Sequence, residues 1–150
     1  MTVRGMTLLA GAGAALALMG MAGAANAQRD DGQPEIYYPF AALDGEQVTG
    51  GGSDEGYGDF SAELDAEKGT ICYMLAVGDV EMTAAHIHQG KAGEDGPPVV
   101  TLENTGADAK TCTEIDTALL RKIGGKPRNY YVNVHTADFP AGAIRGQLEE

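Results

Sequence analysis

Most of the chain beyond residue 36 is divided into short apolar runs bounded by glycine, proline and aspartate. Phe60, Ala62 and Leu64 occupy alternate positions, as in a strand with one buried face. Residues 70–77 (TICYMLAV) are more continuously apolar and rich in β-branched and aromatic side chains, which strands favour. The first run contains Pro39, which cannot donate to a strand ladder and therefore predicts an edge strand. Together these runs predict strands over residues 37–43, 59–66, 70–77, 84–88, 99–102, 110–115, 130–135 and 143–148.

One segment has the periodicity of a helix. Asp116 can accept hydrogen bonds from the free N–H groups of a first helical turn. The apolar residues that follow share one face: Leu119, Leu120 and Ile123. Gly124 and Gly125 then end the helix. Seven to eight short strands with one short helix predict an all-β fold, an antiparallel β-sandwich.

The first 27 residues have the composition of a secretory signal peptide. Arg4 precedes an almost wholly apolar run over residues 6–21, and Ala25-Asn26-Ala27 supplies a small-x-small cleavage site. The apolar run, about 16 residues, is shorter than the roughly 20 residues of a membrane-spanning helix. We therefore expect a periplasmic or secreted protein with no stable membrane insertion after cleavage. The expected organisation is a signal peptide over 1–27, a flexible segment over 28–36 and one domain over 37–150.

Charge and cysteine content narrow the classes of partner and the compartment. The formal net charge is −12 and becomes −13 when Arg4 is removed with the signal peptide. A nucleic-acid partner is not expected, because phosphate binding needs clustered lysine and arginine. Cys72 and Cys112 are the two cysteines of the chain, and an even number in an exported protein predicts a disulfide. Free thiols or metal ligation are the alternatives.

The three histidines of the chain are the residues best suited to specific chemistry. They are His86, His88 and His135. Side chains alternate across a strand, so if Ala85 and Ile87 face the core, His86 and His88 both face away from it. The same alternation places Tyr131, Asn133 and His135 on the outer face of the next-to-last strand, and Arg145 and Gln147 on that of the last. The three imidazoles converge only if these strands are neighbours, and strand order is not visible in the sequence.

Two interpretations of this face remain open. Two imidazoles in a His-x-His pair, plus a third, suit copper or zinc. Alternatively, the histidines join Asn133, Arg145 and threonine side chains in a hydrogen-bonded polar network. Arg145 weighs against a metal because its fixed positive charge repels a cation, so the sequence favours the network, with no cofactor. An enzyme is not expected, because Ser53 and Ser61 lack the setting of a catalytic nucleophile, and Glu94-Asp95 fits no EF-hand loop.

Three segments of the chain resemble the chordin-type (CHRD) domain. They are AAHIHQGKAGEDGPPVVTL, residues 116–120 and NYYVNVHTADFPAGAIRGQL, and the resemblance extends over about residues 37–148. Chordin is a secreted animal protein that captures growth factors, but it carries several such domains beside cysteine-rich modules that this chain lacks. The resemblance therefore implies a non-catalytic binding or structural module, with an unidentified protein or envelope partner, and no growth-factor binding. The AHIHQG segment is also similar to the copper-binding strand of copper–zinc superoxide dismutase, whose remaining ligands have no counterpart here.

Overall fold

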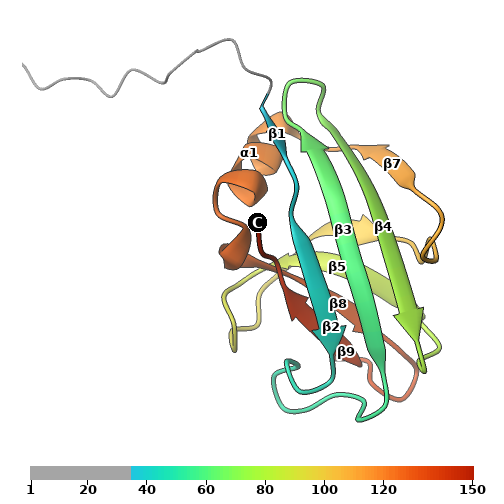
Figure 1. Ribbon diagram of the computed structural model, residues 1–150. Helices are drawn as coiled ribbons and strands as arrows, with labels where there is room; N and C mark the ends of the chain where they lie inside the picture. Colours follow the sequence, from blue (N-terminus) through green and yellow to red (C-terminus); the bar gives the residue numbers. More distant parts are fainter. Residues whose placement is uncertain (1–34) are drawn as a thin grey trace, which may run out of the picture. The chain divides into compact units, whose positions relative to one another are not determined.

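The computed structural model describes residues 35–150, which form antiparallel strands, one α-helix and one short 3-10 helix (Figure 1). The predicted signal peptide and residues 28–34 lie outside the described residues. The elements follow the chain in this order: β1 (Ile36–Tyr37), β2 (Phe40–Asp44), β3 (Tyr57–Asp65), β4 (Thr70–Gly78), β5 (Ala84–Gln89), β6 (Pro98–Leu102), β7 (Thr111–Glu114), α1 (Thr117–Gly125), η1 (Pro127–Asn129), β8 (Tyr130–His135) and β9 (Ile144–Gln147).

All strands belong to one antiparallel sheet in the order β6-β5-β8-β9-β2-β3-β4-β7, with β1 paired to β3. The strand β2 meets β9 at a single residue pair, Asp44 opposite Arg145. At this junction the sheet curls strongly, so that β5 and β8 lie behind β3 and β4 (Figure 1). The predicted all-β antiparallel fold with one short helix is therefore confirmed, and the two layers of the sandwich are the two halves of one curled sheet.

The hydrophobic core lies between the two halves. Fully buried side chains come from both of them, including Leu64, Ile71, Leu75, Ile87, Val132, Val134 and Ile144. The helix α1 packs against β1, β3 and β4, and Leu120 and Ile123 join the core. Its start is as predicted, because the Asp116 side chain accepts a hydrogen bond from the backbone N–H of Leu119 at 3.0 Å. The alternation of apolar residues therefore identified the buried face of β3, β5, β8 and β9.

The prediction that Pro39 marks an edge strand is wrong. The strand that follows it, β2, lies between β9 and β3. Pro39 lies between β1 and β2, because a residue without an N–H group interrupts the ladder for a short distance. Its carbonyl still accepts a hydrogen bond from the N–H of Ala62 at 2.9 Å, so the chain stays beside β3.

The predicted disulfide is confirmed. Cys72 on β4 lies directly opposite Cys112 on β7, and the two are bonded. The bond fastens β7, the edge strand of its half of the sheet, to β4. Within residues 35–150, no helix is long and apolar enough to cross a membrane.

Candidate metal centre

The three histidines lie on neighbouring strands. β5 pairs with β8 in a register that places His86 opposite Asn133 and His88 opposite Tyr131. His135 lies at the end of β8, opposite Ala84. The core-facing residues between them are fully buried, so the histidines occupy the other face of the sheet, as strand alternation predicted. The sequence analysis required these strands to be neighbours for the imidazoles to converge. The pairing of β5 with β8 meets this condition.

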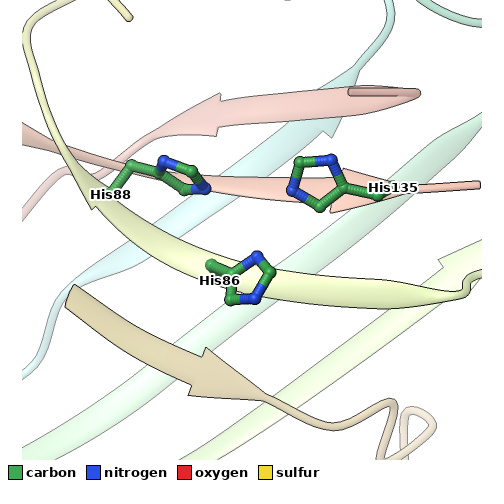
Figure 2. Close-up of side chains that lie close together, drawn as sticks. All are labelled: His86, His88 and His135. Atoms are coloured by element: carbon green, nitrogen blue, oxygen red, sulfur yellow. The ribbon is translucent and has the colours of Figure 1, made fainter. Parts of the chain in front are cut away.

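One nitrogen from each imidazole lies within 4.8 Å of those from the other two. The ring centroids of His86 and His135 are 5.3 Å apart, and those of His86 and His88 are 5.6 Å apart. Figure 2 shows the three rings around one point, with a nitrogen of each directed toward the others. The sequence-predicted cluster is thus present. No aspartate, glutamate or cysteine joins this group among the described residues.

Backbone carbonyls hold two of the rings. The Nδ1 atom of His88 lies 2.7 Å from the carbonyl oxygen of Gly96, and that of His135 lies 3.0 Å from the carbonyl oxygen of Pro140. A carbonyl can only accept, so Nδ1 carries the proton in both rings. The Nε2 atom of each ring is then left with a free lone pair. Metal-binding histidines commonly have this arrangement, in which the second nitrogen donates to a carbonyl and fixes the ring.

Three buried imidazole nitrogens have no hydrogen-bond partner among the described residues: Nδ1 of His86, Nε2 of His88 and Nε2 of His135. Buried polar atoms are nearly always paired, so three such atoms in one cluster call for an explanation. A bound cation would satisfy all three at once. These observations fit a metal ion held by three nitrogen ligands.

The electrostatic setting favours the neutral form of His86 and His88. Burial, followed by the nearby His135 and His88 rings, lowers the pKa of His86 below its ordinary value of 6.5. Burial also lowers the pKa of His88, although its bond to Gly96 acts in the opposite direction. Only neutral imidazole binds a metal, so both rings are ready to act as ligands near neutral pH.

Arg145 does not hydrogen-bond to an imidazole among the described residues. Its Nη2 atom donates to the carbonyl oxygens of Lys91 and Glu94, both at 2.9 Å. Its Nη1 atom donates to the hydroxyl of Thr49 at 3.1 Å and to the carboxylate of Asp95 at 3.4 Å. The guanidinium therefore anchors the loop over residues 91–95.

The ring of Tyr131 lies between Arg145 and the histidines. The guanidinium carbon of Arg145 is 3.5 Å from the centroid of the Tyr131 ring. On the neighbouring strand, the His88 ring stacks on Tyr131 at a centroid distance of 5.0 Å. Tyr131 therefore lies between the guanidinium and the imidazole of His88. Both Tyr131 and Arg145 are only 2% exposed.

Asn133 is buried on the same face but is tied to another loop. Its side-chain nitrogen donates to the carbonyl oxygen of Ala141 at 3.0 Å, while its Oδ1 atom has no partner among residues 35–150. Asn133 and Arg145 lie opposite each other in the sheet register, yet each binds a different loop. The polar residues of this face thus position loops around the histidines.

Sequence reasoning missed three components of this site. It placed Tyr131 on the correct face without giving it a role, and its stacking on His88 became visible only with the strand register. The carbonyl groups of Gly96 and Pro140 leave no signal in side-chain chemistry. The only available clue was that glycine- and proline-rich loops follow both histidine-bearing strands.

A family comparison covers the whole of this site. The model of the CHRD domain matches residues 40–148, which is well over half of the chain. The chain belongs to the CHRD-domain family. The match includes all three histidines and every strand from β2 to β9. No curated protein and no solved structure matches the chain, so the chemistry of this CHRD domain has to be argued from its own residues.

Proposed function

We propose that this CHRD-domain protein is an exported, non-catalytic module that binds a copper or zinc ion through His86, His88 and His135. The observation that carries the proposal is the set of three buried, unpartnered imidazole nitrogens in one cluster. A hydrogen-bonded network of histidine, asparagine and arginine fits less well. The contacts of Arg145 and Asn133 go to loop atoms and leave the imidazoles unpaired.

The cluster needs only a small adjustment to hold an ion. Nitrogen ligands bind copper or zinc at about 2.0–2.1 Å, which places them about 3.3–3.6 Å from one another. The nitrogens lie within 4.8 Å of one another, so each pair has to approach by about 1.5 Å at most. The carbonyl groups of Gly96 and Pro140 already fix two of the three rings, and His86 is left to complete the set.

Export and a non-catalytic role form the other parts of the proposal. The predicted signal peptide supports export, and so does the Cys72–Cys112 disulfide, because disulfides persist mainly in oxidising compartments. Among residues 35–150, the candidate centre consists of three imidazoles, with no aspartate or glutamate in the group to act as a general base. Binding of an ion, rather than turnover of a substrate, is the simplest use of such a centre.

A second candidate function is contact with a protein or envelope partner. Phe40 on β2 and Tyr57 on β3 are 47% and 56% exposed, and both lie on the outer face of the other half of the sheet. Exposed aromatic residues are common in binding surfaces. This surface is separate from the histidines, so both functions are compatible in one module.

Titration of the metal-free protein with copper and with zinc tests the metal proposal. The wild type is compared with the His86→Ala/His88→Ala double variant and with Thr101→Ala, a control on β6 opposite His86. We expect micromolar or tighter binding by the wild type and the control, and loss of that binding in the double variant. Equal, weak binding by all three proteins would eliminate the metal centre and leave the partner-binding module.

A further inference from the structure

We propose that the ion for which this centre is built is monovalent copper, Cu(I). This inference rests on the proposed metal-binding function and specifies which ion the site selects. Its basis is the juxtaposition of three neutral nitrogen ligands with a buried guanidinium, and the absence of a carboxylate from the ligand group of the described residues.

The first argument is the charge of the ligands. The group contains three imidazoles and, among the described residues, no aspartate, glutamate or cysteine. Neutral ligands leave the charge of the ion uncompensated. The cost of moving an ion out of water rises steeply with its charge, so an uncompensated divalent ion is penalised much more than a monovalent one.

The second argument is the positive charge beside the site. The Arg145 side chain is 3% exposed. One aromatic ring, that of Tyr131, lies between its guanidinium and the His88 imidazole. Its carboxylate partner, Asp95, is 74% exposed, so water weakens the compensation that this carboxylate provides and leaves part of the guanidinium charge uncompensated. The buried cation thus repels the bound ion in proportion to the charge of that ion. At about 10 Å and an effective dielectric constant of about 20, one extra unit of charge lowers affinity roughly tenfold.

The third argument is the number of ligands. Cu(II) prefers a square or tetragonal arrangement of nitrogen and oxygen ligands. The described residues offer three convergent imidazole nitrogens, from two adjacent strands, and no fourth histidine, cysteine, aspartate or glutamate in the group. Cu(I) has a filled d shell and accepts three ligands without a geometric penalty. Ligand number therefore disfavours Cu(II), whereas charge disfavours both Cu(II) and Zn(II).

Competition titrations on the full mature protein test this selection. Cu(I) is added under anaerobic conditions as its acetonitrile complex, and bicinchoninate competes with the protein for the ion. No thiol reductant is needed, so the disulfide stays intact. Zn(II) is titrated in a separate experiment against a chromophoric zinc indicator. We expect Cu(I) to bind at least about tenfold more tightly than Zn(II). Equal or tighter binding of Zn(II) would overturn the inference.

Two variants isolate the contribution of charge. The Arg145→Gln substitution should lower the ratio of Cu(I) affinity to Zn(II) affinity by about tenfold, because it removes the positive charge that weakens Zn(II) binding more than Cu(I) binding. Replacing Asp95→Asn should widen the ratio, because the guanidinium loses its counter-charge. Asp95 is exposed, so this second variant decides the matter if Arg145→Gln does not fold. Ratios that stay unchanged in every folded variant would contradict the inference.

The outcomes separate this inference from the metal-binding proposal on which it rests. Zinc binding that is stronger than Cu(I) binding, and is lost in His86→Ala/His88→Ala, would overturn only the preference for Cu(I). Failure of the wild type to bind any of the ions would overturn both. Cu(I) binding that persists in the double histidine variant would also overturn both, because the ion would then lie elsewhere.

Discussion

A single glycine determines how His88 is held. The carbonyl oxygen of Gly96 accepts the hydrogen bond from His88 Nδ1. A Cβ atom added to Gly96 would lie only 1.7 Å from the backbone oxygen of Gln89, so no other residue fits without moving the loop. The orientation of this imidazole therefore depends on the close approach of two backbone segments.

Replacing Gly96→Ala should weaken metal binding without removing a ligand. The displaced carbonyl would no longer fix the His88 ring, and loss of such a supporting contact costs about 10- to 100-fold in affinity. The measurement is metal affinity by competition, with circular dichroism to verify the fold. Gly125→Ala is the matched control, because an added Cβ there meets nothing within 4 Å. An unchanged affinity in Gly96→Ala would show that the carbonyl does not orient the ligand.

The histidines should also make the stability of the metal-free protein depend on pH. In the folded protein the pKa values of His86 and His88 lie below the ordinary 6.5, chiefly because of burial. The unfolded chain therefore takes up protons at a higher pH than the folded one. The stability that the neutral rings contribute is fully present above about pH 6.5 and is lost as the pH falls through the lowered pKa values.

Urea unfolding between about pH 7.5 and pH 5 measures this effect. The wild type should lose more stability across that range than His86→Gln/His88→Gln, whose side chains do not titrate. The carboxylates are common to both proteins, so the difference between the two curves isolates the histidines. Parallel curves would mean that neither ring is held neutral by the fold.

Strand alternation predicted the faces of individual residues but not what covers them. His86, Tyr131 and Arg145 lie on the face opposite Ile87, Val132 and Ile144, as expected. The sequence predicted a hydrogen-bonded polar network on that face, and it did not show that Tyr131 and Arg145 would be almost fully buried there. Loops cover them through backbone atoms, and a backbone contact leaves no pattern in the sequence.

At the scale of elements, local sequence patterns predicted where the strands and the helix lie along the chain, but not the order of the strands in the sheet. The alternation around Phe60 and the apolar run before Gly78 located β3 and β4, and Asp116 located the start of α1. The order β6-β5-β8-β9-β2 depends on pairings between distant segments, which no local pattern encodes. The prediction from Pro39 was wrong because a proline is equally consistent with a break in a strand and with an edge strand. Only the pairing of β2 with β9 and β3 distinguishes the two.

Removal of the helix cap should have a small, measurable cost. The Asp116 side chain satisfies the N–H of Leu119, and loss of such a cap costs about 1 kcal/mol. Asp116→Ala should therefore lower the free energy of unfolding by about that amount in urea titrations. Asp116→Asn keeps an acceptor at the same place and should retain most of the stability. Equal losses in the two variants would assign the effect to charge rather than to capping.

Loss of the disulfide should cost stability without affecting the metal centre. Cys72 and Cys112 are 40 residues apart, and closing such a loop is worth about 4 kcal/mol in the chain-entropy model, with smaller values often measured. Cys72→Ala/Cys112→Ala should therefore unfold at lower denaturant concentration. Its metal affinity should match the wild type, because β4 and β7 lie in the half of the sheet without histidines. A folded double variant with impaired metal binding would contradict this separation.

At the scale of the whole molecule, the first prediction concerns processing. Arg4, the apolar run and Ala25-Asn26-Ala27 predict that the exported protein begins at Gln28. Intact-mass analysis of the protein from its native compartment should give that start, with or without cyclisation of the glutamine. Recovery of the chain with Met1 in a membrane fraction would identify the segment as an anchor instead.

The junction between β2 and β9 has a consequence for when the protein can fold. These two strands lie about 100 residues apart in the sequence. At the other end of β2, Phe40 exchanges two backbone hydrogen bonds with Glu149, just after β9. A chain emerging from a ribosome or a translocation channel can pair β2 with β3 early, but β2 lacks its second neighbour until β9 is released. Arg145, which anchors the loop beside the histidines, is also on β9. Completion of the sheet and anchoring of the loop over residues 91–95 therefore await the same late event. On the proposed metal-binding function, an exported chain would then acquire its ion after translocation rather than carry it across.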